Sequence, residues 1–409
     1  MKLLVLSHLF PNKSFPSFGV FVMNQLLQLA GLEAQIEVIA PVPFSPKVIS
    51  GISSKWRLYS QIERTRSVNN MKIYYPRYLR LPGRWFRPFA GRSMYFSIIA
   101  QYRNLFSSSS FDVILANSIT PDGEVAVQLG KQLGIPSACY AIGDDIISYP
   151  HESPRMLRKT QFILQNLNGV ICHGTGLKKM VEEMAPGVQD ITTIYRGINL
   201  ERFYSDPLQR RKTRQQLGFK DDAFIFLFVG YLEKRKGLFE IMNVFPELFK
   251  KYNHIYLLFI GDIVAKAEFQ PWISRPDIAS RANYIGTVNH SQIPAYMNAA
   301  DAFLLPSLWE GTPNAIAEAA ACGLPIVTTN IPGAHDLLGE KYKPFLVEPG
   351  NENDLFEKAS HVIESETLRR QMSSIAIDRI RKYFDAQQNA RRLKEYLQNL
   401  ILKNQKAGC

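Results

Sequence analysis

The sequence predicts an α/β protein built from two successive parallel β-sheets, and three observations support this class. The chain has 409 residues, and because a domain usually holds about 100–200 residues, it should form two or three domains. Short apolar runs alternate with helical patterns along most of the chain, which is typical of β-α-β units. The alternation stops in a polar, charge-rich segment at residues 201–222 and then starts again.

The first half opens with a β-α-β unit. An apolar run covers Lys2–Ser7, a helical pattern covers Val20–Ala30, and a second apolar run covers Gln35–Ala40. Because parallel strands need a crossover of this kind, the unit predicts a parallel sheet. The same alternation then returns in four further runs: Phe111–Ala116, Ser137–Ala141, Gly169–Cys172 and Ile191–Ile194.

The second half repeats this organisation. Helical patterns at Leu238–Tyr252 and Ile293–Ala300 separate its apolar runs, and an amphipathic helix is expected at Ile377–Lys406. We therefore place an N-terminal domain at residues 1–198, a second domain at 199–380 and a C-terminal helix at 381–409, with the option that this helix packs back on the N-terminal domain. The predicted strands are Phe224–Val229, Ile255–Ile260, Ala282–Ile285, Ala302–Leu305, Ile326–Thr329 and Pro344–Val347.

Composition excludes several classes of protein. Apolar residues make up 46% and charged residues 21% of the chain, close to globular averages, so it is not disordered as a whole. No apolar stretch reaches the roughly 18 residues of a membrane-spanning helix, and the N-terminal run is too short for a signal peptide. The four cysteines lie far apart, which indicates neither a disulfide framework nor a zinc site. The chain is therefore expected to be cytoplasmic.

Positive charge is concentrated in one window, from Lys47 to Phe111. The whole chain has a formal net charge of +12, and this window holds twelve Lys or Arg against one acid, Glu63, a local charge of +11. Such a field implies an anionic partner. Aromatic residues among the arginines fit stacking on single-stranded nucleic acid or contact with a membrane interface. The third interpretation is a solvated face over an ordinary core.

The strongest candidate for a ligand site is the segment Pro306–Pro325. It begins just after the carboxyl end of a predicted strand, where α/β sheets bind ligands. Thr312 suits an N-cap, Pro313 suits the first helical position and Gly323 suits the C-terminal stop. A helix is therefore expected from Pro313 to Cys322.

The start of this helix should bind an anion. The backbone N–H groups of Gly311–Ala315 are expected to face the crevice, as in other anion sites at helix N-termini. Glu310 and Glu318 frame the site and would repel a phosphate placed between them, so they are expected to accept hydrogen bonds from the hydroxyls of a sugar and a ribose. The alternative is that both are surface charges favoured near a helix start. The chain has no P-loop, no H-E-x-x-H, no G-x-S-x-G and no Asp-x-Asp sequence, so a metal-held diphosphate is not expected.

At these residues the sequence resembles a known family. The segment PSLWEGTPNAIAEAAACGLPIV resembles the donor-site motif of family-4 retaining glycosyltransferases, in which seven residues separate two glutamates, here Glu310 and Glu318. The resemblance implies the GT-B fold: two Rossmann-like parallel-sheet domains facing a central cleft, here with a C-terminal helix. Looser similarity is carried by Phe18–Val22, Asp112–Gly123, Gly143–Ile146, Tyr195–Phe203 and Phe228–Gly237.

The resemblance also implies roles for particular residues. Lys236, the helix N–H groups and the loop at Gly19 would stabilise the donor diphosphate, Glu310 would hold sugar hydroxyls and Glu318 the ribose. Asp145 and Asn117 would face the acceptor or the reacting sugar. The implied catalytic residues are Glu310, Lys236, Asp145 and Asn117. The implied donor-binding residues are Gly19, Tyr231, Lys236, Glu310, Gly311, Thr312, Pro313, Asn314, Ala315 and Glu318.

The sequence departs from the family pattern at three positions. Tyr231 stands where the family usually has a second cationic diphosphate ligand, and either Lys234 or Arg235 could replace that charge. Asn117 stands near the usual position of a histidine that touches the donor sugar. Ile142 replaces a frequent His or Arg, so no catalytic histidine is expected. The remaining candidates, His173 and His335, are interpreted as loop or packing residues.

The resemblance implies a retaining glycosyltransferase that uses a nucleotide-diphosphate sugar without a metal or other cofactor. The acceptor would be a saccharide or a lipid-linked molecule in polysaccharide or cell-envelope glycan synthesis. Two alternatives stay open: a GT-B sugar-nucleotide epimerase or hydrolase, and a non-catalytic membrane-associated partner protein. A lipid-linked acceptor favours the membrane interpretation of the basic window over nucleic acid, with the protein peripheral on the inner face of the cell membrane. The expected membrane contacts are Arg80, Arg84, Trp85, Phe86 and Arg87.

Overall fold

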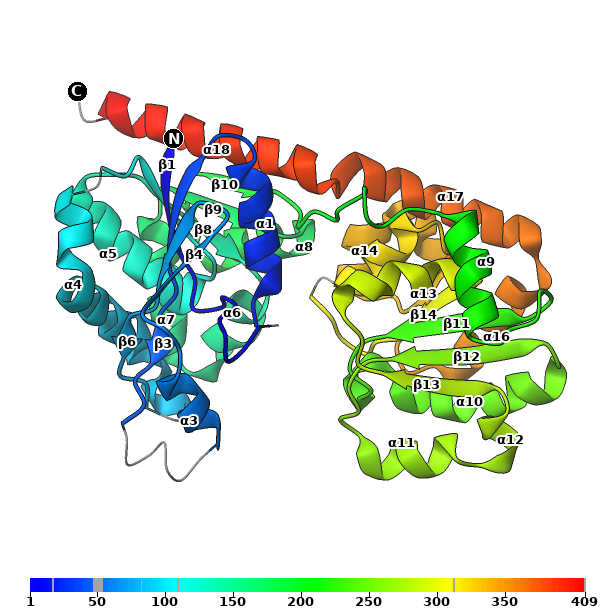
Figure 1. The fold of residues 1–409 in the computed structure, drawn as a ribbon. Coiled ribbons are helices and arrows are strands. Elements are labelled where there is room, and N and C mark those ends of the chain that lie inside the picture. Colours follow the sequence, from blue (N-terminus) through cyan, green and yellow to red (C-terminus); the bar gives the residue numbers. More distant parts are fainter. Residues whose placement is uncertain (17, 47–53, 82, 109, 312, 408–409) are drawn as a thin grey trace. The chain divides into compact units, whose positions relative to one another are not determined.

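The structure of the protein is a computed structural model that describes residues 1–16, 18–46, 54–81, 83–108, 110–311 and 313–407. The chain forms two compact units (Figure 1). Unit 1 contains Met1–Gly197 together with Ala386–Cys409, and unit 2 contains Ile198–Asp385. The borders expected from the sequence were residues 198 and 380.

Unit 1 is built on an eight-stranded sheet with the order β10-β9-β8-β7-β1-β2-β5-β4. All neighbours are parallel except β4 and β5, which pair antiparallel. Every residue of β7, β8 and β9 is buried, as expected for a parallel sheet that is covered on both faces. The strands are β1 (Lys2–Leu6), β2 (Gln35–Ile39), β4 (Thr65–Val68), β5 (Met71–Tyr74), β7 (Val113–Ala116), β8 (Ser137–Ala141), β9 (Gly169–Cys172) and β10 (Ile191–Thr193).

Helices cover both faces of this sheet. One hydrophobic core lies under α4, α5, α7 and α8. The other core lies under α1 and α18, to which α18 contributes Leu393, Leu397 and Leu400. Their spacing places these leucines on one face of α18, so the last helix is part of unit 1. The helices are α1 (Val20–Ala30), α3 (Ser54–Ser60), α4 (Ala90–Ser108), α5 (Glu124–Leu133), α6 (Asp144–Ile147), α7 (Pro154–Asn166), α8 (Thr175–Met184) and α18 (Ala386–Ala407).

The basic window has more regular structure than the sequence predicted. A hairpin joins β4 to β5 through Asn69 and Asn70, both with positive φ, and a small parallel sheet pairs β3 (Val42–Pro43) with β6 (Arg77–Tyr78). The 3-10 helix η1 (Arg84–Phe89) then leads into α4. The first predicted residue of the window, Lys47, lies outside the described residues.

Unit 2 contains a five-stranded parallel sheet with the order β13-β12-β11-β14-β15. The predicted strand at Pro344–Val347 is wrong, because Pro344 lies in the 3-10 helix η6 (Glu340–Phe345) and only one bridge joins Thr329 to Val347. Proline has no N–H group to donate to a strand ladder. The strands are β11 (Phe224–Val229), β12 (Ile255–Ile260), β13 (Ala282–Gly286), β14 (Ala302–Leu305) and β15 (Ile326–Thr328). The helices are α9 (Pro207–Gln216), α10 (Leu238–Lys251), α11 (Lys266–Ile273), α12 (Pro276–Ala279), α13 (Ile293–Ala299), α14 (Asn314–Ala321), α15 (Pro332–Leu338), α16 (Glu352–Glu364) and α17 (Glu366–Tyr383).

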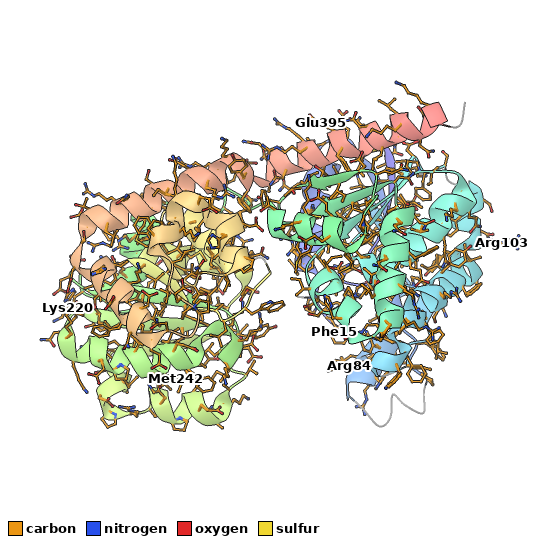
Figure 2. All side chains as sticks on the ribbon, turned by 180° about the vertical axis from the view of Figure 1, so that it is seen from behind. Phe15, Arg84, Arg103, Lys220, Met242 and Glu395 are labelled. Carbon is orange, nitrogen blue, oxygen red and sulfur yellow. The ribbon has the colours of Figure 1, made fainter. Side chains whose placement is uncertain are left out.

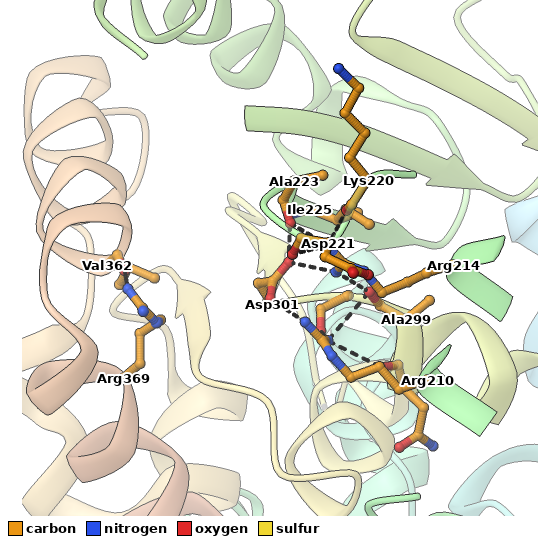
Figure 3. A network of polar contacts seen from close by, with 12 residues as sticks. Arg210, Arg214, Lys220, Asp221, Ala223, Ile225, Ala299, Asp301, Val362 and Arg369 are labelled. Carbon is orange, nitrogen blue, oxygen red and sulfur yellow. Dashed lines mark hydrogen bonds and ion pairs between the residues drawn. The ribbon is translucent and has the colours of Figure 1, made fainter. Parts of the chain in front are cut away.

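A polar network fixes the start of β14 (Figure 3). Asp301, just before this strand, accepts hydrogen bonds from Arg210 Nη2 at 2.6 Å and Arg214 Nη1 at 3.1 Å, both on α9. Asp301 also accepts the backbone N–H of Ile225 on β11 at 2.8 Å. The buried Arg214 donates to the carbonyl of Ala299 at 3.0 Å. The network therefore ties α9, β11 and β14 together at one edge and fixes the strand whose other end carries the candidate site.

None of the helices in the described part of the chain is both long and apolar enough to cross a membrane.

Candidate active site

The candidate site in unit 2 is formed where β11 and β14 end. The loop after β11 leads into the 3-10 helix η4 (Lys234–Lys236), and the loop after β14 leads into α14. The two loops touch at Gly237, which has φ +76° and whose hypothetical Cβ would lie 2.0 Å from the carbonyl oxygen of Pro306. Only glycine allows this approach without strain. The backbone thus holds the residues on either side of Gly237 and Pro306 close together.

Glu310 and Lys236 meet in this place. Lys236 Nζ forms an ion pair with Glu310 Oε1, and the side chains of the two residues are only 14% and 8% exposed. Ser307 Oγ also donates a hydrogen bond to Glu310 Oε1 at 3.3 Å. Because the pair is largely withdrawn from water, its charges interact more strongly than a surface pair would. The structure brings together these two predicted catalytic residues.

Arg235 adds a second cation to the site. Its Nη1 lies 3.8 Å from Glu310 Oε1, and its Nη2 donates to Glu233 at 2.7 Å. Lys234, the other cation considered from the sequence, is exposed. Tyr231 itself is exposed just after β11.

The helix after β14 starts one residue later than predicted. It covers Asn314–Ala321 and has Pro313 at the N-cap, instead of Pro313 as its first residue. The predicted N-cap, Thr312, lies outside the described residues. The N–H groups of Asn314 and Ala315 are at the open end of the helix, where no carbonyl four residues earlier can accept them. Gly311 is held nearby, since its carbonyl packs against Gly333 of α15.

Glu318 has a partner that the sequence analysis did not identify. This carboxylate is buried on α14, and its Oε1 lies 2.7 Å from Nε2 of His290. His290 stands at the start of the 3-10 helix η5 (His290–Gln292), before α13, and its side chain is 47% exposed. The contact excludes the interpretation of Glu318 as a plain surface charge. No spacing in the sequence connected these two residues.

In unit 1, Gly19 is the N-cap of α1 and has the left-handed conformation. Its φ is +70°, and a Cβ there would lie 2.3 Å from the carbonyl oxygen of Leu9. The loop after β1 therefore packs directly on the start of α1, and a larger residue at this position would separate them. The predicted contact of this loop with a diphosphate stays a prediction.

Asp145 holds a loop in place. It is buried, and its carboxylate accepts backbone N–H groups of Ile119 at 2.8 Å, Gly143 at 2.9 Å and Ile142 at 3.0 Å. Burial raises the pKa of Asp145 to about 6, although these hydrogen bonds favour the ionised form. The side chain therefore positions the turn after β8, and its predicted contact with an acceptor or sugar stays a prediction. Asn117 is also buried, with Nδ2 3.4 Å from Ser7 Oγ.

A histidine–aspartate pair in unit 1 was missed by the sequence analysis. His8 Nδ1 lies 3.0 Å from Asp122 Oδ2, and the His8 backbone N–H donates to Asp122 Oδ1 at 3.1 Å. Asp122 is 1% exposed and also accepts from Ser118 Oγ at 3.1 Å. His8 follows the carboxyl end of β1, and that position in the sequence could have identified it as a ligand candidate.

The two histidines considered from the sequence are structural. His173 is buried and stacks on Tyr140 with ring centroids 4.5 Å apart. Its Nδ1 lies 3.2 Å from the carbonyl oxygen of Ile194. Burial, with a smaller effect from Arg196, lowers the pKa of His173 to about 3. His335 lies against Asn330 within unit 2.

The predicted membrane contacts form an apolar and basic surface around η1 in unit 1. Trp85 is 88% exposed, and Arg80, Arg84 and Phe86 are exposed as well. Figure 2 shows Arg84 at the surface of this unit. Arg87 differs, because its Nη1 binds Glu152 at 3.0 Å and its guanidinium lies 3.9 Å from the ring of Tyr149.

Within the described residues, no group of three or more His, Cys, Asp or Glu is arranged to hold a metal ion. Lys236, Arg235 and the N–H groups at the start of α14 are groups of the kind that can bind phosphate.

A comparison with known protein families finds a match within unit 2. Residues 209–379 match the family model described as "Glycosyl transferases group 1". The glycosyltransferase TuaC of Bacillus subtilis, provisionally assigned to teichuronic acid biosynthesis, is 25% identical over 403 residues, which cover 98% of this chain and 99% of TuaC. The UDP-Gal:alpha-D-GlcNAc-diphosphoundecaprenol alpha-1,3-galactosyltransferase of Escherichia coli is 24% identical over 316 residues, 75% of this chain and 80% of that protein.

Solved structures show the fold. Sucrose-phosphate synthase from Thermosynechococcus elongatus superposes with a TM-score of 0.76 at 16% identity, covering 98% of this chain and all of that one. HepE from Anabaena in complex with UDP gives a TM-score of 0.72 at 18% identity, with the same coverage. The fold is therefore GT-B, and the prediction of two Rossmann-like parallel sheets with a C-terminal helix is confirmed.

Proposed function

We propose that this chain, which the family model and the relatives indicate to be a group-1 glycosyltransferase, transfers a sugar from a nucleotide-diphosphate sugar to a saccharide or lipid-linked acceptor of the cell envelope. We further propose that the transfer retains the anomeric configuration and needs no metal. The observation that carries the proposal is the largely buried ion pair between Lys236 and Glu310 beside the start of α14. The proposal of a nucleotide-diphosphate sugar as donor rests on this ion pair and on the resemblance of the segment with Glu310 and Glu318 to the donor-site motif.

The proposed chemistry breaks the bond between the anomeric carbon and the diphosphate oxygen. The electron pair leaves with the diphosphate, the acceptor hydroxyl oxygen bonds to the same carbon, and its proton passes to a phosphate oxygen of the leaving group. Negative charge grows on the diphosphate during this step. Lys236, Arg235 and the N–H groups of α14 are fixed in advance where they can stabilise it, and such preorganised groups usually give the largest catalytic effect.

The two glutamates have separate roles in this proposal. Glu310 accepts hydrogen bonds from hydroxyls of the transferred sugar and also keeps Lys236 in place, through their ion pair, until the donor binds. Glu318 accepts from the ribose hydroxyls, with His290 on its Oε1 fixing the orientation of the carboxylate. Ribose contacts are similar in the ground state and the transition state, whereas contacts to the diphosphate strengthen as the reaction proceeds.

The acceptor class is supported by the relatives and by the surface around η1. The E. coli relative is named for a diphosphoundecaprenol substrate, and TuaC for teichuronic acid synthesis. We propose peripheral contact with the anionic inner face of the cell membrane through Arg80, Arg84, Trp85, Phe86 and Arg87. The exposed Trp85 suits the interface and the arginines suit anionic lipid, each Arg contributing about 1 kcal/mol.

Vesicle co-sedimentation tests this membrane contact. Replacing Arg80, Arg84 and Arg87 by Ser should release the protein from anionic vesicles, because three attractive charges are lost, and should leave binding of the sugar nucleotide unchanged. Raising the salt concentration should release the unaltered protein as well, since exposed charges are screened beyond about 8 Å at physiological ionic strength. Equal sedimentation of both proteins with anionic vesicles at low salt contradicts the membrane contact.

The transfer proposal is tested with purified protein and a panel of nucleotide sugars. The donor is identified by thermal shift, and nucleotide-diphosphate release is then followed with and without lipid-linked acceptors. Lys236→Ala should lower the rate by about 10²–10³, the usual loss when one stabilising donor is removed. The matched control is Lys234→Ala, an exposed cation two residues away, which should keep near-normal activity. The anomeric proton coupling of the product reports retention, and excess EDTA should leave the rate unchanged.

Four outcomes would overturn parts of this proposal. Full donor turnover without any acceptor would support the epimerase or hydrolase alternative, and donor binding without any turnover would support the non-catalytic one. Equal activity of the two lysine variants would remove Lys236 from the site. Loss of activity in EDTA that Mg²⁺ or Mn²⁺ restores would refute metal independence.

A further inference from the structure

Unit 1 contains a cavity of about 560 Å³ that the donor site does not use. It lies between the ends of β1 and β6, η1 and the start of α4, and its lining includes His8, Tyr78, Arg80, Arg84, Phe86 and Tyr149. Three arginines line it, and no Asp or Glu occurs among its described lining residues. The size is that of a small-molecule site, and the charge favours an anion.

Two of the three arginines are placed to meet a ligand. Arg87 is held by Glu152 and Tyr149. For Arg80 and Arg84, by contrast, the described residues supply no ion pair, and both side chains are exposed. A guanidinium binds phosphate oxygens through two parallel N–H groups. The pair therefore suits a phosphate or diphosphate at the cavity wall.

Part of the cavity lining is both apolar and exposed. Leu79 is 61% exposed, and Leu81, Phe86 and Phe89 are each more than 40% exposed; all four line the cavity. Exposed apolar groups that are gathered around a pocket in this way usually mark a binding surface. A free sugar phosphate would leave them in water, whereas a lipid chain attached to the phosphate would cover them.

His8 also lines the cavity. Its Nδ1 is occupied by the buried Asp122 at 3.0 Å, so Nε2 is the ring nitrogen left for a ligand in the cavity. A carboxylate on one imidazole nitrogen fixes the tautomer with the proton on that side, which makes the other nitrogen a hydrogen-bond acceptor. His8 Nε2 can then accept a hydrogen bond from a sugar hydroxyl.

We propose that this cavity binds the phosphate-bearing head of a lipid-linked acceptor, with the phosphate at Arg80 and Arg84, the start of the lipid chain against the exposed apolar lining residues, and a sugar hydroxyl at His8. The inference rests on the proposed function and narrows its acceptor to an anionic amphiphile. His8 is a positioning residue for the acceptor, held in place by Asp122.

Binding of three probes to the full-length protein tests the cavity. Farnesyl diphosphate combines an isoprenoid chain with a diphosphate, pyrophosphate has the charge alone, and farnesol has the chain alone. Calorimetry below the micelle concentration should find farnesyl diphosphate bound at least tenfold more tightly than either of the others. Pyrophosphate binding that is as tight as that of farnesyl diphosphate, and that the double variant R80A/R84A weakens, would indicate a free-phosphate site in the cavity. Tighter binding of a single-stranded oligonucleotide would indicate nucleic acid. Either result overturns the proposal.

Matched variants locate the binding. The double variant R80A/R84A should weaken farnesyl diphosphate binding at least tenfold, whereas R57A/R103A, which removes two exposed charges of the same basic window outside the cavity, should change it less than twofold. All four side chains are exposed, so the variants should fold. If both double variants weaken farnesyl diphosphate binding equally, the ligand responds only to the overall positive charge of the window, and this result contradicts a site in the cavity.

Transfer assays separate this inference from the function on which it rests. His8→Gln should raise the KM for a lipid-linked acceptor with little change in the Kd of the nucleotide sugar, since Lys236, Glu310 and Glu318 lie in unit 2. If the unaltered protein binds and transfers a sugar while R80A/R84A and His8→Gln transfer it equally well, the cavity inference fails and the function stands. If farnesyl diphosphate binds as expected but no nucleotide sugar does, the proposed function fails instead.

Discussion

Replacing Gly237 by Ala tests whether the close approach of two loops builds the donor site. Gly237 has φ +76°, and a Cβ there would lie 2.0 Å from the carbonyl oxygen of Pro306. Gly218, in the same unit, has nearly the same φ of +74°, but no atom lies within 4 Å of its hypothetical Cβ. The two substitutions therefore share the backbone strain and differ only in the clash.

The magnitudes follow from this geometry. The left-handed conformation costs a non-glycine residue about 1–2 kcal/mol, so Gly218→Ala should lower the free energy of unfolding by that amount. At Gly237, an ordinary contact of 3.4 Å requires Pro306 to move by about 1.4 Å, and such overpacking adds about 1–3 kcal/mol. Lys236 and Glu310 lie on the two loops that are forced apart. A misplacement of about 1 Å can lower the rate about 10²-fold.

Urea unfolding and steady-state kinetics measure both effects. Gly218→Ala should keep kcat/KM within about twofold of the unaltered protein, because it lies away from the site. Gly237→Ala should be the less stable variant and should lose kcat/KM by about two orders of magnitude. If the two variants have the same stability and the same activity, the Gly237–Pro306 contact does not organise the site and the reasoning is refuted.

Three further predictions concern single side chains. Arg214→Met should lower the free energy of unfolding by about 3 kcal/mol in urea titrations, because it removes a buried partner of Asp301; a loss below 1 kcal/mol would show that the network is dispensable. Glu318→Ala should raise the KM for the nucleotide sugar about tenfold with little change in kcat; a fall in kcat alone contradicts the ribose role. Because the pKa of His173 is about 3 in the folded chain, the unfolded chain takes up the extra proton as the pH falls below about 6.5. Stability should therefore fall by about 1.4 kcal/mol per pH unit between pH 6 and 4. In the variant His173→Phe, the free energy of unfolding should lack this part of its dependence on pH. Equal pH dependence in the two proteins would contradict the assignment of the effect to His173.

The buried strands could be predicted from the sequence because both faces of a parallel sheet are covered. Such strands read as continuous apolar runs, and β11 and β12 have the predicted bounds. The hairpin of β4 and β5 was missed because neither strand is a continuous apolar run: β4 alternates between exposed and half-buried residues, and β5 places an exposed lysine between two buried residues. Asn69 and Asn70 were the available signal, since asparagine tolerates the positive φ that a two-residue hairpin requires.

The candidate site was only partly predictable, for a physical reason. The motif located Glu310, Lys236 and Glu318, but a motif does not say which side chains will meet. His8 and Asp122 are 114 positions apart and come together because β1 and β7 are parallel neighbours that end at the same edge of the sheet. The pairing of these two strands is a long-range contact of the tertiary structure, and no local sequence pattern near either residue predicts it.

The basic window shows why a charge count overstates the field outside the protein. Arg87 is paired with Glu152 at 3.0 Å, and Arg92 lies 4.0 Å from Glu124, and both acids come from segments beyond the window. The local charge of +11 is therefore reduced in the folded chain by acids that the count left out. Exposed charges in water are also screened by salt. Arg80 and Arg84 are exposed too, but they line a cavity and therefore lie next to whatever enters it. The attraction for an anion should accordingly be strongest at Arg80 and Arg84 and weaker over the rest of the window. Removing these two arginines should therefore weaken the binding of a phosphate-bearing amphiphile more than the binding of a plain anionic surface.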